Sequence, residues 1–256
     1  MVLMYHNIAR EEQQIDFKEW QPAYDVSYAD FLTHLALFRA HEQARARLHL
    51  TFDDGYGSLY RLLWPLLEKD RIRCTCFVTT AKIGAAGMLC REEIVALAQA
   101  GVEFGTHSHS HVFLAQLTRT QLEQEVLVPQ KILADLLGKE ISTMSLPGGR
   151  YDEALLEYAS VCGFREIFTS KPGHEPLVSS KIPNVRLWPR WVITADSTTT
   201  ELTRILRESK WHISKSVMLH QLGKLGKRAL GNTGYHFLWQ NLQYLKTSFR
   251  SGKDTS

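Results

Sequence analysis

The feature that most constrains the fold is a regular alternation of short apolar runs with longer segments of helical spacing. Leu48, Leu50 and Phe52 alternate with polar positions, as in a strand with one buried face. Strands are expected at residues 2–5, 48–52, 74–80, 102–104, 141–146, 166–169, 185–193 and 217–219. Helices are expected between them at residues 30–44, 59–69, 91–100, 118–138, 153–162, 199–209 and 235–249. Such alternation is typical of parallel strands joined by crossover helices, so we expect an α/β fold.

The length of 256 residues fits one large domain as well as two small ones. A single α/β barrel commonly has about 250 residues, and no internal repeat, low-complexity tract or linker divides the chain. We therefore expect a single domain over residues 1–250. A polar tail at residues 251–256 is expected to be disordered.

Local signals mark several helix boundaries. Ser27 with Asp30, and Thr118 with Gln121, have the spacing of capping pairs at helix starts. Pro65 interrupts a helical run and is expected either to kink that helix or to begin its second half.

The charge balance excludes two classes of partner. A formal net charge of +3 is too small for a chain that binds nucleic acid or anionic lipid. No uncharged apolar run approaches the ~18 residues that a membrane span needs.

The N-terminus has no basic region before its short apolar stretch, so it does not resemble a signal peptide. We expect a cytoplasmic protein, or an exported or envelope-associated one if an export signal has been removed.

Four cysteines in so long a chain do not form a disulfide framework. Cys74 and Cys76 are two apart and therefore face the same side of a strand. They lack a second pair that would complete a four-cysteine metal site. We expect Cys74, Cys76, Cys90 and Cys162 to be reduced and structural.

In folds of this class the chemistry lies at the carboxyl ends of the strands. The second strand ends in Asp53 and Asp54, followed by Gly55. Adjacent carboxylates on an extended segment point in different directions, which suits one to a metal and the other to a proton. The alternative is an Asp-Asp-Gly turn that caps the next helix.

The fourth strand is followed by three histidines in five residues, His107, His109 and His111. On a helical turn His107 and His111 would lie on the same side, whereas an extended segment would align all three. Neutral imidazole is the commonest protein ligand for zinc and similar ions. The alternative is a polar loop with no ligand function.

Together the two clusters form a stronger pattern than either alone. Asp54, His107 and His111 would leave open positions for water and substrate, as catalytic metal sites do. Asp53 would then be a base beside the metal. His220, after the last expected strand, is either a structural residue at the barrel mouth or a catalytic one.

These motifs resemble the polysaccharide deacetylase family of carbohydrate esterases. The resemblance is carried by LTFDDGY at residues 50–56, THSHSH at 106–111 and MLH at 218–220. It extends to LMYHNI at 3–8, SLPGGRYDE at 145–153 and GFREIFTS at 163–170. It implies a distorted, incomplete (β/α) barrel of seven or eight mostly parallel strands. It also implies hydrolysis of the acetamide of an N-acetylated sugar, which releases acetate and leaves an amine.

The resemblance also implies residue roles. Asp53 would be the base, and Asp54, His107 and His111 would hold one divalent ion, expected to be Zn²⁺, with Co²⁺, Mn²⁺ or Ni²⁺ as alternatives. His220 would be the general acid that protonates the departing amine.

The third motif departs from the family pattern, which in many members is Arg-Pro-Pro-Tyr-Gly with an Arg that orients the base. Here Ser145 stands at the Arg position and Gly148 at the Tyr position, which opens that wall of the cleft. A backbone N–H near Gly148 would still be an oxyanion donor. Arg150 either reaches Asp53 from another direction or is an exposed loop residue.

Two further groups have both a functional and a packing interpretation. Tyr5 and His6, at the end of the first strand, either line the cleft or pack in the core. Trp188, Arg190 and Trp191 only loosely match a fourth family motif, an aromatic with an Asp that tunes the general acid, and could equally be barrel packing.

The leading hypothesis is a metal-dependent enzyme that removes N-acetyl groups from an oligo- or polysaccharide. The alternatives are a catalytically silent carbohydrate-binding barrel, a deacylase of a non-polymeric N-acyl substrate, and a non-haem iron oxygenase, whose metal also takes two histidines and a carboxylate. The expected partner is an N-acetylated saccharide; the sugar, the polymer length and any protein partner are left open.

Overall fold

The computed structural model describes residues 1–10, 22–178, 182–208 and 216–218. The chain divides into a compact unit over residues 1–209 and a second unit over 210–256. In the second unit the described residues 216–218 are helical, so the strand expected at 217–219 is not found at Val217 and Met218. The expected last helix, the polar tail and His220 lie outside the described residues, and the predicted extent of the domain stays a prediction.

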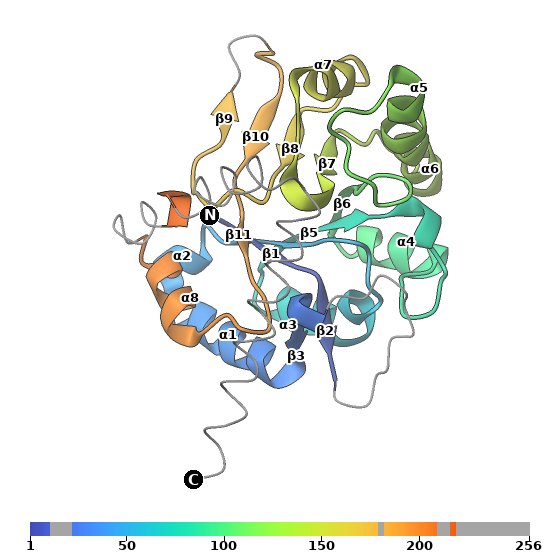
Figure 1. The fold of residues 1–256 in the computed structure, drawn as a ribbon. Helices are drawn as coiled ribbons and strands as arrows, with labels where there is room; N and C mark the ends of the chain where they lie inside the picture. The colour runs from blue at the N-terminus through green and yellow to red at the C-terminus, as the bar shows by residue number, and fades with distance from the viewer. Residues whose placement is uncertain (11–21, 179–181, 209–215, 219–256) are drawn as a thin grey trace. The chain divides into compact units, whose positions relative to one another are not determined.

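The first unit is built on one curled sheet with helices around it (Figure 1). Its strand order is β11-β1-β4-β5-β6-β7-β8-β10-β9, and every neighbouring pair is parallel except β9 with β10. The strands are β1 (Val2–Tyr5), β4 (His49–Phe52), β5 (Arg73–Val78), β6 (Glu103–Thr106), β7 (Thr143–Ser145), β8 (Glu166–Phe168), β9 (Leu177–Val178), β10 (Arg186–Trp188) and β11 (Trp191–Val192). The expected distorted, incomplete (β/α) barrel of mostly parallel strands is confirmed. A separate parallel pair is formed by β2 (Asn7–Ala9) and β3 (Asp25–Ser27).

The helices begin and end close to the expected boundaries. They are α1 (Tyr28–Ala40), α2 (Glu42–Arg45), α3 (Trp64–Lys69), α4 (Arg91–Gln99), α5 (Arg119–Leu122), α6 (Val128–Leu137), α7 (Glu153–Val161) and α8 (Thr199–Leu206). Ser27 accepts a hydrogen bond from the Asp30 N–H, and Thr118 with Gln121 forms a capping box. Pro65 lies in the first turn of α3, after a π-helical turn over Leu59–Leu63, so it begins the second half of that run.

The run expected as one strand at residues 185–193 is two strands at different places in the sheet. β10 pairs with β8, whereas β11 pairs with β1 near the other edge. Pro189 has no N–H for a ladder, and the Arg190 N–H donates to the Lys171 carbonyl (2.8 Å) rather than to a strand. The chain therefore crosses between two distant strands of the half-barrel, and Arg190 lies on that crossing.

The core lies between the sheet and its helices. Phe31, Leu35 and Phe38 of α1 are fully buried, as their helical spacing predicts. Within the curl of the sheet, Phe77 and Phe168 pack with Val2. The four cysteines are free, with Cys74 and Cys76 buried on β5. Among the described residues, no helix has both the length and the apolar character needed to span a membrane.

Gly105 on β6 shows how closely the sheet is packed, and it yields a first prediction. A Cβ at this position would lie 2.5 Å from Thr143 Oγ1 and 2.7 Å from the Phe77 ring. Gly105→Ala is therefore expected to lower the free energy of unfolding by about 3 kcal/mol. The control is Gly138→Ala, where nothing lies within 4 Å of the new Cβ and φ is +63°, with an expected cost of about 1 kcal/mol. Urea unfolding measures both, and equal losses would contradict the close packing.

Candidate active site

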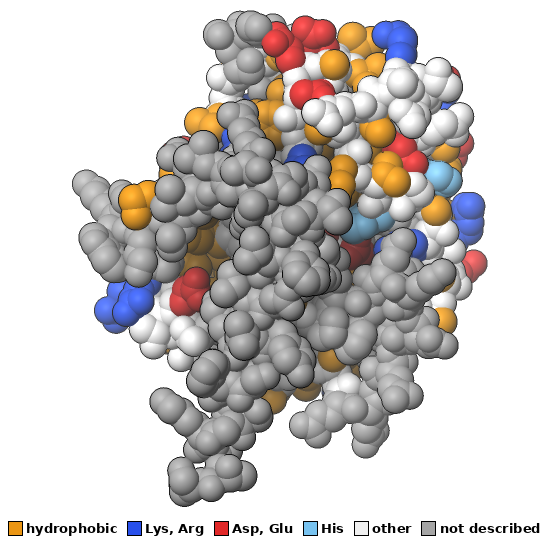
Figure 2. Space-filling model, viewed as in Figure 1, with side chains coloured by type: hydrophobic (Ala, Val, Ile, Leu, Met, Phe, Trp, Pro, Cys, Tyr) orange, Lys and Arg blue, Asp and Glu red, His pale blue; other side chains and the backbone are white. Residues whose placement is uncertain are grey.

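The polar residues of the predicted site lie at the carboxyl ends of parallel strands, at one edge of the sheet. Asp53 and Asp54 follow β4, His107 follows β6, and Ser145 ends β7. These strands lie close together in the sheet, so residues far apart in sequence meet at the carboxyl end of the half-barrel. Figure 2 shows histidine and acidic side chains next to each other on one face of the molecule.

Asp54, His107 and His111 form a compact group, referred to below as the Asp-His-His group. One ligand atom from each lies within 4.8 Å of the other two. Nε2 of His111 is 3.2 Å from Asp54 Oδ1, and Nε2 of His107 is 3.8 Å from the same oxygen. His109 lies outside this group, with its Nδ1 2.9 Å from Thr80 Oγ1.

The loop geometry differs from the helical turn considered for the histidines. Residues 107–111 are not helical, and His111 comes beside His107 because Ser108 and His111 both have left-handed backbones, with φ of +61° and +65°. Asp54 is likewise left-handed, with φ of +73°. Such conformations cost of order 1–3 kcal/mol each and concentrate at functional sites. Two members of the Asp-His-His group therefore lie on strained backbone.

Glu125 stabilises this strained loop from a helical turn. Its carboxylate accepts hydrogen bonds from the N–H groups of His109 (3.0 Å) and Ser110 (2.9 Å), and from the Ser110 hydroxyl (2.6 Å). Within the loop, Ser108 Oγ accepts from the His111 N–H (2.8 Å). The only sequence signal for Glu125 is an acidic residue within a helical run, which does not distinguish it from a solvated one.

The Asp-His-His group fits a divalent cation. Asp54 Oδ1 is buried and has no hydrogen-bond partner among the described residues, although two imidazole nitrogens face it. Nδ1 of His107 donates to the Ser145 carbonyl (3.0 Å), which leaves the lone pair on Nε2. Burial lowers the pKa of His107 to about 4, so its imidazole is neutral at pH 7. A buried oxygen lone pair and a neutral imidazole are suited to a metal ligand set.

Asp53 makes a different set of contacts, centred on Arg190. The guanidinium donates from Nη1 to Asp53 Oδ1 (2.7 Å) and from Nη2 to Asp53 Oδ2 (2.8 Å). The Ser145 hydroxyl donates to Oδ2 (2.9 Å) and accepts from Arg190 Nη2 (2.7 Å). Arg190 also donates to Thr51 Oγ1 (3.0 Å) and to the Thr169 carbonyl (2.9 Å). Arg190 is fully buried, and these five hydrogen bonds use its guanidinium donors.

The pairing fixes the protonation state of Asp53. Burial by itself would raise the pKa of this carboxyl group. The positive charge of Arg190, the nearby His107 and the hydrogen bonds from Arg190 outweigh burial and hold the pKa of Asp53 well below its ordinary value. Asp53 is therefore an oriented carboxylate at neutral pH.

Arg190, rather than Arg150, pairs with Asp53. The Arg150 guanidinium lies over the Phe113 ring, 4.1 Å from its centroid. Ser145, at the position of the motif arginine, hydrogen-bonds to both Asp53 and Arg190. The sequence groups Arg190 with Trp188 and Trp191, either as a loose motif match or as barrel packing. Its place among tryptophans in an apolar run was the available signal, because burying an arginine charge requires a partner.

Tyr5 and His6, which were also expected near the site, differ in position: Tyr5 lies in the core and His6 lies beside the site. Tyr5 is fully buried and stacks on Phe52, and its hydroxyl group hydrogen-bonds to His34 Nδ1 (3.1 Å), so it packs in the core rather than lining the cleft. His6 lies against the Tyr24 ring, 4.4 Å between centroids. Burial lowers the pKa of His6, and the nearby Asp54 and Asp53 oppose that shift, which places His6 beside the site.

The remaining aromatic and loop residues of the prediction are also placed. Trp188 stacks on Phe168 at 6.1 Å, and Trp191 is buried, so both are barrel packing. Gly148 is exposed at the turn after β7, with φ of +63°. His220 lies outside the described residues, so its role stays a prediction.

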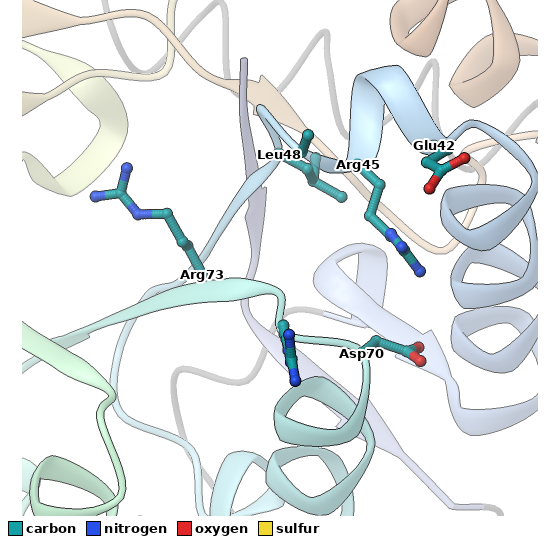
Figure 3. A pocket seen from close by; sticks show the side chains of 7 residues that line it. Glu42, Arg45, Leu48, Asp70 and Arg73 are labelled. Carbon is teal, nitrogen blue, oxygen red and sulfur yellow. The ribbon is translucent and has the colours of Figure 1, made fainter.

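A cavity of about 250 Å³ lies away from this site, at the amino ends of β4 and β5 (Figure 3). It is lined by Glu42, Arg45, Ala46, Leu48, Asp70, Arg71 and Arg73. Asp70 pairs with Arg39 (2.8 Å) and Arg73 with Glu103 (3.6 Å), so two of its charges are compensated within the fold. Because this cavity lies at the opposite ends of the strands, it is not part of the site formed by Asp53 and the Asp-His-His group.

Comparison with known proteins agrees with this geometry. The sequence model of a family described as polysaccharide deacetylase matches residues 40–167. YxkH of Bacillus subtilis, named for a polysaccharide deacetylase, is 28% identical over 180 residues, which cover 67% of this chain and 64% of YxkH. The peptidoglycan-N-acetylglucosamine deacetylase of Bacillus cereus is 23% identical over 147 residues, covering 54% of this chain and 67% of that protein. The chain thus spans about two thirds of the length of these relatives.

A solved structure shares the fold. The Streptococcus pyogenes deacetylase PplD, in complex with acetate, superimposes with a TM-score of 0.63 at 20% identity. The match covers 80% of this chain and 96% of that one. At this identity the likeness establishes a common architecture.

The pairing of Asp53 with Arg190 generates a stability prediction. Arg190→Met is expected to lower the free energy of unfolding by about 3–5 kcal/mol, because it leaves a buried carboxylate uncompensated. The Asp53→Asn, Arg190→Met double variant is expected to lose less than the sum of the two single variants. Chemical unfolding at pH 7 measures this double-mutant cycle.

A matched control for that cycle is Arg186→Met. Arg186 also pairs with a carboxylate, Glu166, but 56% of its side chain is exposed. Its loss is expected to cost at most about 1 kcal/mol. If Arg190→Met costs no more than Arg186→Met, the buried pair is not the constraint inferred above.

Proposed function

Because the chain belongs to the polysaccharide deacetylase family, we propose that it hydrolyses the acetamide of an N-acetylated amino sugar in an oligo- or polysaccharide. The reaction consumes water, releases acetate and leaves a free amine on the sugar. The observation that carries the proposal is the unsatisfied, buried oxygen of Asp54 beside two imidazoles, next to an oriented carboxylate, Asp53. The names of relatives that act on chitin and on peptidoglycan N-acetylglucosamine favour an N-acetylglucosamine polymer as the substrate.

Asp54, His107 and His111 would hold one divalent cation, for which we propose Zn²⁺ with Co²⁺, Mn²⁺ or Ni²⁺ as substitutes. When bound, such an ion supplies Lewis-acid polarisation of the amide carbonyl and acidifies water. The protein contributes the preset ligand geometry: Ser145 fixes the His107 tautomer through its carbonyl group, and Glu125 holds the loop between the two histidines.

Asp53 is the proposed base that takes the proton of the attacking water. A carboxylate has about four acceptor positions. Arg190 uses one on each oxygen, and Ser145 uses the second on Oδ2. Oδ1 therefore keeps one free acceptor position. Arg190 fixes the plane of the carboxylate through two parallel hydrogen bonds. The free acceptor position on Oδ1 therefore has a fixed direction.

The later steps use residues whose roles come from the family resemblance. The backbone N–H near Gly148 would donate to the developing oxyanion, and such a donor survives the replacement of the motif tyrosine. His220 would protonate the departing amine. Arg150, whose guanidinium lies over the Phe113 ring, is proposed to act on the substrate side of the site rather than on Asp53.

Two alternatives differ in measurable products. A silent carbohydrate-binding barrel would bind sugar without releasing acetate. A deacylase of small N-acyl compounds would release acetate from monomers as readily as from polymers. Acetate release from N-acetylglucosamine and from its oligomers, before and after chelation and metal restoration, separates these possibilities from the proposed enzyme.

The metal site gives a prediction with a readout independent of turnover. The Asp54→Ala, His107→Ala double variant is expected to lose its bound divalent metal, measured by elemental analysis after dialysis. His109→Ala is the matched control from the same loop and is expected to keep its metal. Equal metal content in the double variant and the wild type would show that the cation is held elsewhere.

The role of Asp53 gives a prediction about rate. Asp53→Asn cannot accept a proton, so turnover is expected to fall about 10²–10⁴-fold while metal content is kept. The variant also leaves the Arg190 charge unpaired, so its stability is expected to fall, and the assay is run well below its melting temperature. Ser145→Ala, which removes one hydrogen bond to the same carboxylate, should lose less activity. A loss of turnover that only follows lost metal would make Asp53 a ligand instead.

A further inference from the structure

Two residues after His111 of the Asp-His-His group, the chain carries an exposed aromatic ring, Phe113, that the reaction itself does not use. We propose that Phe113 is a sugar-binding platform that stacks on the ring neighbouring the deacetylated one, so that the site is built for chains of two or more sugars. This inference rests on the proposed function and names the form of its substrate. Its contacts, its position and its chemistry each support it.

Phe113 is exposed although the segment around it is anchored. Val112 and Phe113, directly after His111, are 40% and 51% exposed, whereas Leu114 is fully buried. A single exposed apolar residue is common on protein surfaces and needs no special explanation. The contacts of Phe113 with its neighbours, rather than its exposure alone, therefore support a binding role.

The ring is fixed in place by the turn after β7. The Arg150 guanidinium carbon lies 4.1 Å from the ring centroid, in a cation–π contact. On the Gly148 side, an ideal Cβ on that glycine would lie only 2.6 Å from Phe113 Cε1. The ring therefore occupies the space of a side chain at position 148, where the family motif has tyrosine. A ring held by both neighbours loses little freedom when a ligand binds.

The position of the ring connects it to the proposed chemistry. Phe113 is two residues after His111, a member of the Asp-His-His group. The Gly148 turn follows Ser145, which contacts Asp53 through its hydroxyl group and His107 through its carbonyl group. Phe113 therefore lies where the histidine loop meets the turn that supports the base. A saccharide that is bound with its acetamide at the Asp-His-His group and extends along these two loops would meet the Phe113 ring.

The chemistry of the pair suits a pyranose ring. The face of an aromatic ring carries negative quadrupole charge and packs against the partly positive C–H groups of a sugar face. The Arg150 guanidinium over the same ring places a positive charge there, which favours the electron-rich hydroxyl or acetyl oxygens of a sugar. An apolar face with an adjacent charged group distinguishes a sugar ring from a plain hydrocarbon ligand.

The test compares N-acetylglucosamine with its β-1,4-linked tetramer as substrates. Phe113→Ala is expected to lower kcat/KM for the tetramer about 3- to 10-fold and for the monosaccharide less than about twofold. Phe113→Trp is expected to keep the wild-type value for both. Val112→Ala, the exposed neighbour on the same loop, is the matched control and should change neither. Unchanged melting temperatures confirm that the variants are folded.

A binding measurement separates this inference from the proposed function. Calorimetry of the chelator-treated protein reports tetramer binding without turnover. If wild type releases no acetate from any sugar, the proposed function fails, and tetramer binding that Phe113→Ala weakens but Val112→Ala does not still supports the platform. Equal losses on monosaccharide and tetramer, equal effects of the two variants, or no tetramer binding would overturn it.

Discussion

The buried pair between Arg190 and Asp53 is the interaction on which the rest of the site depends. Arg190 is fully buried and bonds to groups on or directly after three different strands, through Asp53, Ser145 and the Thr169 carbonyl. A buried charge is tolerated only when it is paired and its donors are satisfied. The guanidinium therefore joins the end of β4 to the ends of β7 and β8, which are separated from β4 in the sheet by β5 and β6.

The same pair gives the two adjacent carboxylates, Asp53 and Asp54, different properties. Arg190 holds Asp53 ionised and oriented, which lowers its basicity, whereas the unsatisfied oxygen of Asp54 faces the imidazoles of His107 and His111. A weakly basic carboxylate is effective only when the water it deprotonates is itself made acidic. The two aspartates are thus useful together, and one oxygen of each lies 3.8 Å from His107 Nε2.

The sequence predicted the parts of this arrangement that local patterns encode. Strand ends and short spacings placed Asp53, Asp54, His107 and His111 at one edge of the sheet, and the structure brings them together. Arg190 reaches Asp53 from 137 positions away, on a crossing hidden inside an apolar run that resembles one strand. Tyr5 was ambiguous for a related reason, because a strand-end aromatic can turn to the core or to the cleft, and here His34 and Phe52 hold it in the core.

The crossing between β10 and β11 has a consequence for how such barrels lose activity. Since Arg190 lies on that crossing, the proposed base Asp53 is also the counter-ion of an arginine that joins the strand ends. A descendant of this barrel that no longer turned over substrate would still need Asp53 for its architecture. Loss of catalysis would therefore be recorded first at Asp54, His107 and His111, whose removal leaves no buried charge without a partner. In barrels with this pairing, an intact first aspartate indicates a closed fold, whereas activity is indicated by Asp54, His107 and His111, which we propose as metal ligands.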